Sequence, residues 1–372
     1  MYKKEFRTLL IFYFSFLWFS IFSRSILPTY YLKQGFTFNE MIWGSVLIFA
    51  SQIIALLTLR RLTSRISWYL AIITWLAFIF LIIKLFSVYQ FYLAMFVSGL
   101  TLFFFFVFYN IAHFELTPTE KRGESSAVMF GTGSLISVIA PIFAGFLAQI
   151  NIALIWIFSS VSFLICFYLT GLQKNFELRY SVKEALQEIE STRIFIFLQG
   201  IWEALVIGII PIYTLFFIKT PFYYGTFVAY LALAGVVSTF LLGRFTDKLQ
   251  KRSVFLYPLT LSMAAVTFMF PYATKNIGLW VILSGAISFL LPVFWNISTA
   301  MVVDRNPDLN RAIPGRELTL AFGRLLGLFI TALSFLVQQP PRYIFLVLGV
   351  VILLFPAILY WNTRIKKAYK YL

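Results

Sequence analysis

The sequence predicts an all-α integral membrane protein with twelve transmembrane helices arranged as two pseudo-symmetric six-helix bundles. Of its 372 residues, 61% are hydrophobic and only 12% are charged, so the chain lacks the polar surface of a soluble domain. A membrane-spanning helix needs about 20 mostly apolar residues, and twelve such runs are present. Short motifs also recur between the two halves. A membrane β-barrel would instead show alternating segments of roughly 10 residues.

The twelve runs are divided evenly between the halves of the chain. The first run follows three basic residues and is too long for the core of a signal peptide, so it is taken as a span. The six spans expected in the first half are residues 8–31, 41–59, 67–86, 90–113, 125–148 and 152–171. Those expected in the second half are residues 194–218, 222–243, 253–272, 277–302, 318–338 and 343–362.

Two repeated motifs indicate that the halves arose by duplication. Phe108-Tyr109-Asn110-Ile111, late in the fourth span, returns as Phe294-Trp295-Asn296-Ile297, late in the tenth. Gly123 followed by Phe130-Gly131 recurs as Gly315 followed by Phe322-Gly323, and the order of the two motifs is kept. Internal repeats of several membrane helices are typical of secondary transporters, whose halves move about a site between them.

A polar stretch, residues 172–193, separates the predicted bundles 1–171 and 194–372. We interpret this stretch as a plain linker on the cytoplasmic side. The alternative is a short helix lying at the membrane interface, because four apolar residues share one face at helical spacing. These residues are Val182, Ala185, Leu186 and Ile189.

Basic residues set the expected orientation in the cell membrane. With the N-terminus inside, the cytoplasmic segments hold 23 of the 30 Lys and Arg residues, and every loop obeys the positive-inside rule. Both termini are therefore expected in the cytoplasm. The net charge of +16 is spread over one membrane face, so nucleic-acid binding is not expected.

The segment after the eighth span carries the most specific local motif. The motif consists of a glycine, an aspartate and three basic residues, namely Gly243, Asp247, Lys248, Lys251 and Arg252. The glycine permits a close turn at the helix end, and the aspartate can pair with a basic group or cap the next helix. The basic residues keep the loop on the cytoplasmic side of the membrane. At these positions the chain resembles the major facilitator superfamily, a resemblance that implies two six-helix bundles, alternating access and a gating role for the five residues.

Two departures from the family pattern accompany this resemblance. Gln250 replaces the second Gly of the loop, and in the first-half copy Arg61 stands where the family has an acid. This second change puts the usual latch between the halves in doubt.

The sequence Ala140-Pro141-Ile142-Phe143-Ala144-Gly145 in the fifth span resembles, in weakened form, the Gly-Pro motif of antiporters, which favours export.

Glu203 is the first candidate for proton coupling. It lies nine residues into the seventh span, about 14 Å along a helix, near the centre of a hydrocarbon core about 30 Å thick. A charge at that depth costs roughly 2.5–3.5 kcal/mol on insertion scales, and a buried carboxyl is suited to reversible protonation. The alternative is a structural pair with an arginine.

Two arginines within the spans are candidates for substrate binding. Arg24 and Arg324 can either extend to the headgroups or face a water-filled cavity, where a guanidinium binds carboxylate or phosphate. The repeat relation of the first and seventh spans favours contact of Arg24 with Glu203 across the cleft. Arg324 lies in the same half as Glu203, and is the better candidate for a structural pair.

Several uncharged polar residues complete the candidate site. Asn110 and Asn296 occupy equivalent positions in the repeat, and each needs a hydrogen-bond partner in its bundle or on a ligand. Gln199 and Trp202 are further candidates for substrate contact. His113 is interpreted as a boundary residue at the end of its span. We expect no metal and no cofactor, and no Walker loop for ATP is present.

These features predict a non-enzymatic, monomeric secondary transporter of a small organic solute, with membrane lipids around it and a proton or another ion as its coupling partner. A transporter-like sensor or a lipid translocase is the alternative. A membrane-embedded transferase fits less well, because the predicted outer loops are short and offer only Glu40 as an acid.

Overall fold

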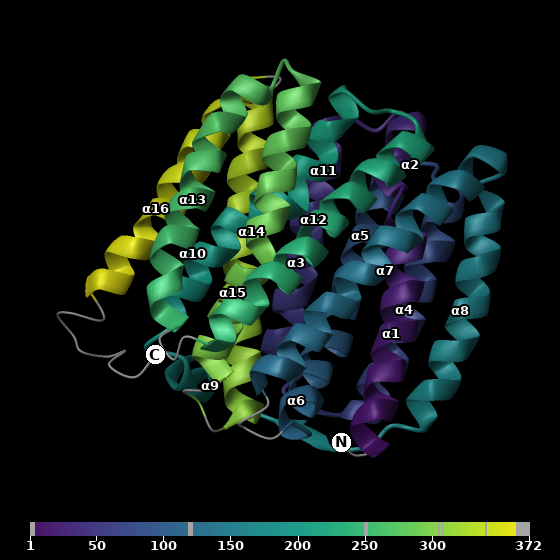
Figure 1. Ribbon diagram of the computed structural model, residues 1–372. Helices are drawn as coiled ribbons and strands as arrows, with labels where there is room; N and C mark the ends of the chain where they lie inside the picture. Colours follow the sequence, from purple (N-terminus) through teal and green to yellow (C-terminus); the bar gives the residue numbers. More distant parts are fainter. Residues whose placement is uncertain are drawn as a thin grey trace.

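The computed structural model describes residues 4–117, 122–248, 252–303, 306, 308–338 and 341–361. Twelve helical segments in this part of the chain are long and apolar enough to cross a membrane, which confirms the predicted spans. They stand side by side, so that α1 begins and α16 ends at the end of the molecule where α9 lies (Figure 1). We refer to this end as the α9 end and to the opposite one as the α2 end.

The first six spans are built from nine helical elements. The fourth span contains a turn of π-helix, and the first is divided in two. The elements are α1 (Lys4–Arg24) with α2 (Leu27–Lys33), α3 (Phe38–Thr58), α4 (Ser64–Ile83), α5 (Val88–Leu102) with η1 (Phe103–Val107) and α6 (Phe108–Glu115), α7 (Arg122–Ile150) and α8 (Ala153–Gly171).

The second six spans follow the same order. The seventh span, which is the first of this half, is the most irregular, because it combines α-, π- and 3₁₀-helical turns. The elements are α10 (Arg193–Ala204) with η3 (Leu205–Ile209), α11 (Ile210–Tyr213) and η4 (Thr214–Phe216), α12 (Pro221–Lys248), α13 (Arg252–Ala273), α14 (Ile277–Val303), α15 (Leu309–Val337) and α16 (Tyr343–Tyr360).

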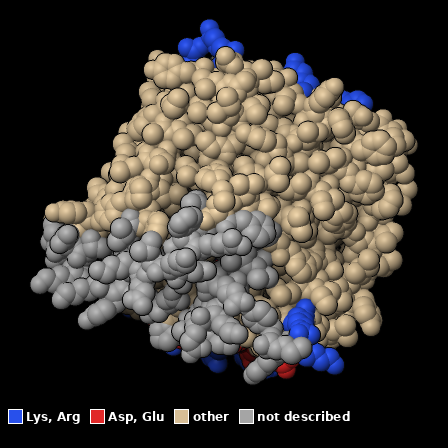
Figure 2. Space-filling model, viewed as in Figure 1, with Lys and Arg blue, Asp and Glu red and all other residues tan. Residues whose placement is uncertain are grey.

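The surface has the character expected of a membrane protein. On the face shown in Figure 2, Lys and Arg lie at the two ends of the molecule, and the visible described surface between them is uncharged. Many of the large exposed side chains on the spans are apolar, including Phe80 at 62% and Ile282 at 64% exposure. Apolar side chains on this outer surface have hydrocarbon as their solvent. The protein is therefore a multi-pass membrane protein.

Two helix pairs make the most extensive contacts between the halves, α7 with α12 and α3 with α15. The first pair approaches backbone to backbone at small residues. A Cβ atom built on Gly225 would lie 2.3 Å from the carbonyl oxygen of Pro141, and one built on Gly145 would lie 2.9 Å from that of Pro221. The Pro141 region, whose sequence suggested export, thus forms the closest part of this crossing.

The segment between the halves is more structured than a plain linker, and that interpretation was wrong. It contains strand β2 (Glu177–Arg179), which pairs antiparallel with β1 (Arg61–Thr63), and helix α9 (Val182–Glu188). The face of α9 that the sequence identified does bury Ala185, and Ile189 just beyond the helix is buried as well. These residues pack against protein, mainly α15, because the end of that helix offers an apolar surface beside Gly315.

The predicted gating segment is also largely helical. We expected the eighth span to end at Gly243, but α12 continues to Lys248, so Gly243 and Asp247 lie within the helix. Arg252 is the first residue of α13. Lys251 lies outside the described residues, and the gating role of all five positions stays a prediction. The low helix propensity of Gly243 does not end α12, because tertiary contacts can override the propensity of a single residue.

Candidate functional site

Glu203 is the centre of a buried polar cluster in the second bundle. Its side chain has no exposed surface, and both of its oxygens accept hydrogen bonds. Nη2 and Nε of Arg324 each lie 2.6 Å from Oε2. Gln199 Nε2 donates to Oε1 at 2.7 Å, and Trp295 Nε1 donates to the same oxygen at 2.6 Å. A buried carboxylate with four donors is compensated for the loss of water.

The arrangement of helices explains why Arg324 is the partner of Glu203. A Cβ atom on Gly200 would lie 2.4 Å from the carbonyl oxygen of Leu320, and one on Gly323 would lie 2.3 Å from that of Phe197. The backbones of α10 and α15 are therefore almost in contact one residue before Arg324. The expected alternative, a pair between Glu203 and Arg24 across the cleft, is not formed in this structure.

Arg324 also reaches the first bundle. Its guanidinium carbon lies 5.3 Å from the centre of the Phe49 ring on α3, a cation–π contact between the halves. The side chain is 17% exposed, whereas that of Glu203 is fully buried. One arginine thus connects the buried carboxylate of one bundle with an aromatic ring of the other.

The spans nearest the cluster depart from regular α-helix. The π-helical turn η3 begins two residues after Glu203, and the π-helical turn η1 lies in the fourth span, directly before Phe108. Single π-turns within α-helices occur frequently at functional sites, because the extra residue redirects side chains and frees backbone groups. The two π-turns lie in spans that are not related by the repeat, and each places irregular backbone beside candidate residues of its own half.

The repeated tetrapeptides agree in burial at three of their four positions. Their first and last residues are buried, and Asn110 and Asn296 are partly exposed. Neither amide forms a hydrogen bond with another described residue, so the helix-packing interpretation lacks support. The aromatic residue that directly precedes each asparagine forms the polar contacts instead. Tyr109 Oη lies 3.2 Å from His113 Nδ1, and Trp295 donates to Glu203.

The contacts of two further residues describe their surroundings. His113 lies in the last turn of α6, at the end of its span as expected, and it is fully buried beside Tyr109 and Phe6. Trp202 has no exposed surface and its Nε1 donates to Thr267 at 3.2 Å, so it packs within the second bundle. Trp295 was missed, although it directly precedes Asn296 in a motif that the sequence had already identified.

Arg24 lies in a different environment at the break in the first span. It ends α1, and the chain turns at residues 25 and 26 before α2 begins with Leu27 and Pro28. Its side chain is exposed, and no carboxylate among the described residues lies within ion-pair distance. The nearby polar groups are the hydroxyls of Tyr31, in the first bundle, and Tyr224, in the second.

The two tyrosines beside Arg24 differ in their hydrogen bonds. Tyr224 Oη donates to the carbonyl oxygen of Pro211 at 3.0 Å. The hydroxyl of Tyr31 is buried and has no hydrogen-bond partner among the described residues. A buried hydroxyl without a partner costs free energy, so a ligand acceptor close to Arg24 would satisfy both groups.

A second buried charged cluster lies toward the α9 end of α15. Arg316 Nη1 lies 2.5 Å from Oε1 of Glu317, and its Nη2 donates to Thr299 at 3.0 Å. Both charged side chains are almost fully buried, 11% and 7% exposed. The sequence placed these residues in a loop, but α15 already begins at Leu309, which takes them into the helix.

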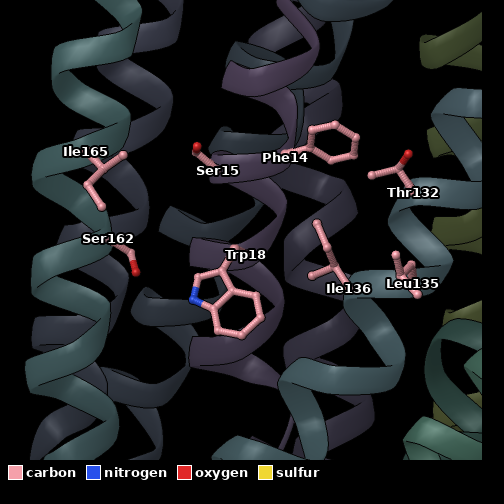
Figure 3. Close-up of a pocket in the computed structure, with 8 residues that line it drawn as sticks. All are labelled: Phe14, Ser15, Trp18, Thr132, Leu135, Ile136, Ser162 and Ile165. Atoms are coloured by element: carbon pink, nitrogen blue, oxygen red, sulfur yellow. The ribbon is translucent and has the colours of Figure 1, made fainter.

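An apolar groove of about 360 Å³ lies on the first bundle, with α1 between α7 and α8 (Figure 3). Its lining is Phe14, Ser15, Trp18, Thr132, Leu135, Ile136, Ser162 and Ile165. Leu135 and Ile165 are more than half exposed, so the groove opens on the outer face of the bundle. It shares no residue with the Glu203 cluster. Among the residues that the structure describes, no group of three His, Cys, Asp or Glu side chains is placed to hold a metal.

Comparisons with known proteins show the fold. No family model and no curated protein matches the sequence. The structure is similar to the crystal structure of the human organic anion transporter MFSD10 (TETRAN), with a TM-score of 0.67 and 13% sequence identity. The match covers 96% of this chain and 100% of the other. This chain therefore has the fold of a major facilitator superfamily transporter, as its sequence motifs predicted.

Proposed function

We propose that this chain is a secondary active transporter that moves a small organic anion across the cell membrane by alternating access. The observation that carries the proposal is the guanidinium of Arg24, which lies at the break of a membrane-spanning helix and has no ion-pair partner among the described residues. A charge within a span is costly unless it serves a function. The solved transporter of the same fold is described as acting on organic anions, which supports the same class of substrate here.

The groups around Arg24 fit a carboxylate or phosphate. A guanidinium presents two parallel N–H donors to such an anion, and the unpartnered hydroxyl of Tyr31 offers a third. Tyr224, which belongs to the second bundle, lies close to the same guanidinium. An anion bound here would contact both halves, as a substrate must if its binding is to affect their relative movement. The amides of Asn110 and Asn296, which bond to no other described residue, are further candidates for contact with the uncharged part of the substrate.

The proposed coupling group is Glu203, with a proton as the coupling ion. Protonation would remove the negative charge that holds Arg324, and Arg324 also lies over Phe49 of the first bundle. The occupancy of the carboxyl by a proton would thereby change a contact between the halves. Export, favoured by the sequence around Pro141, is retained as the proposed direction, and the transporter is proposed to act as a monomer.

Binding can be tested without knowledge of the natural substrate. The thermal stability of the purified protein is measured with a panel of small carboxylates and organic phosphates and with their uncharged amides or alcohols. A bound ligand stabilises the fold by RT ln(1 + [L]/Kd), about 2.7 kcal/mol at 100 times Kd. Stabilisation is expected only from anions. Stabilisation by neutral compounds alone would refute the proposed class.

The role of Arg24 is tested by comparing two charge-removing variants. Arg24→Gln should abolish stabilisation by the anions that the panel identifies. Lys33→Gln removes an exposed positive charge from nearby α2 and should leave stabilisation by the anions intact. The reason is that Arg24, and not Lys33, is the cation that interacts with the hydroxyls of Tyr31 and Tyr224. Flux of an identified anion into proteoliposomes then separates a transporter from a sensor, which binds without flux.

A further inference from the structure

The segment between the two bundles is fixed to both of them, with very little chain between the two attachments. One attachment is strand β2 and its flanking residues on the first bundle, and the other is α9 on α15. Only Tyr180 and Ser181 lie between the end of β2 and the start of α9. The last residue of β2, Arg179, and the first of α9, Val182, are three positions apart, so their Cα atoms can lie at most about 11 Å apart. The two attachment points therefore cannot move far apart.

The attachment to the first bundle consists of many hydrogen bonds. The backbone amide of Ser64 donates to the carbonyl oxygen of Phe176 at 2.8 Å, and the amide of Phe176 donates to the Ser64 hydroxyl at 3.0 Å. Tyr180 Oη donates to the carbonyl oxygen of Leu56 at 2.6 Å. Arg61, which replaces the expected acid of this loop, forms an ion pair with Glu177. Leu178 is buried beneath the strand pair.

The attachment to the second bundle depends mainly on close packing. A Cβ atom on Gly315 would lie 2.2 Å from the carbonyl oxygen of Ala185, so the backbones of α15 and α9 touch at this point. Ile189 is buried in a cluster with Ile196, Val302, Ala312 and Leu320. The ion pair between Arg311 and Glu184, at 3.4 Å, is nearly half exposed and contributes little.

We propose that residues 173–189 form a clasp that holds the two bundles together at the α9 end, and that α9 leaves α15 whenever the bundles part there. This inference rests on the proposed function only in assuming that the bundles part during transport. The helix is the element that releases, because seven residues do not form a stable helix alone and because its ion pair with α15 within the described part of the chain is nearly half exposed. The clasp therefore favours the state that is closed at the α9 end.

Helix α6 of the first bundle reports on this closure, because it contacts α15 of the second bundle at the same end. Backbone hydrogen exchange by mass spectrometry measures the opening of both elements without any substrate. Gly315→Ala places a methyl group where the Ala185 carbonyl lies. Gly171→Ala is the matched control, because its Cβ would meet only the Tyr69 hydroxyl, at 3.3 Å.

Gly315→Ala is expected to speed exchange at least ten-fold in residues 182–189 and also in α6, residues 108–115. The control should change neither segment. Faster exchange in 182–189 with unchanged exchange in α6 would overturn the proposal, because α9 would then be a surface element without influence on the bundles. Since flux is not measured, this result is independent of whether the chain transports an anion.

A crosslink provides the opposite perturbation and covers the case in which Gly315→Ala does not fold. Glu184→Cys and Arg311→Cys are combined with Cys166→Ser and joined by a short bis-maleimide, which fixes α9 to α15. Exchange in α6 should become slower than in the same variant without the crosslinker. A parallel crosslink between Arg61→Cys and Arg179→Cys fixes only the strands within the first bundle and should not slow it. Equal exchange in α6 with and without the 184–311 crosslink would contradict the clasp.

Discussion

At the scale of single residues, the contrast between the two arginines in the spans is the most informative feature. Arg324 forms an ion pair with a carboxylate that is saturated by donors, whereas Arg24 has no described acidic partner. Breaking a buried pair by removing one partner costs roughly 3–5 kcal/mol, because the other charge is left uncompensated. Substitution of Arg24 leaves no described carboxylate without its counter-charge, so it should affect binding more than folding.

Glu203→Gln is expected to abolish accumulation of the transported anion driven by a proton gradient, while exchange of anion across the membrane continues. The amide keeps the shape of the carboxyl but cannot release a proton, and exchange needs no net proton movement. Both rates are measured in proteoliposomes with the anion found in the binding panel. Accumulation that persists from pH 5 to 8 would place coupling elsewhere.

Stability of the same variant has its own control. Glu203→Gln leaves the Arg324 guanidinium without its counter-charge, so the thermal midpoint should fall. Glu203→Gln combined with Arg324→Gln removes both charges and should recover part of this loss. If both transport activities are lost in the single variant and the double variant recovers folding alone, the pair is structural.

At the scale of elements, small residues decide which helices can meet. Gly145 and Gly225 bring α7 and α12 together between the bundles, and Gly200 and Gly323 do the same for α10 and α15 within the second bundle. In hydrocarbon, helices associate by close packing because lipid is as apolar as their side chains. These crossings therefore fix the architecture more than the many large aromatic residues do.

Gly225→Ala should destabilise the protein by about 1–3 kcal/mol, the usual cost of overpacking. The new methyl group would lie 2.3 Å from the carbonyl oxygen of Pro141, and neither backbone can yield without separating α7 from α12. Gly278→Ala is the control, because its closest contact is the side chain of Asn276 at 3.3 Å. Thermal unfolding in one detergent compares the two variants, and equal midpoints would refute the steric argument.

At the scale of the whole molecule, the even number of spans puts both ends of the described chain on one side. The basic residues predict that this side, the α9 end, is cytoplasmic. The linker elements β2 and α9 lie on the same side, where the proposed clasp would act on the closed state. Orientation therefore decides which of the two openings the clasp restrains.

Cysteine labelling in intact cells tests this orientation. A thiol introduced by Lys275→Cys, in the turn between α13 and α14, should react with a membrane-impermeant maleimide from outside. One introduced by Lys174→Cys, at the start of the linker, should react only after the membrane is permeabilised. The native Cys166 is buried and should give little background. The reverse pattern of labelling would invert the topology.

The sequence by itself determined the number of spans, their approximate limits and the repeat, because length and hydrophobicity are local properties that the bilayer selects directly. It also identified Glu203 and the two arginines, because charges within spans are rare. Only the tertiary structure decided that Glu203 pairs with Arg324, since the choice of partner depends on the lateral approach of α10 to α15 at Gly200 and Gly323. The same is true of the linker, whose seven-residue helix has too little local stability to be predicted and is held by its contact with α15.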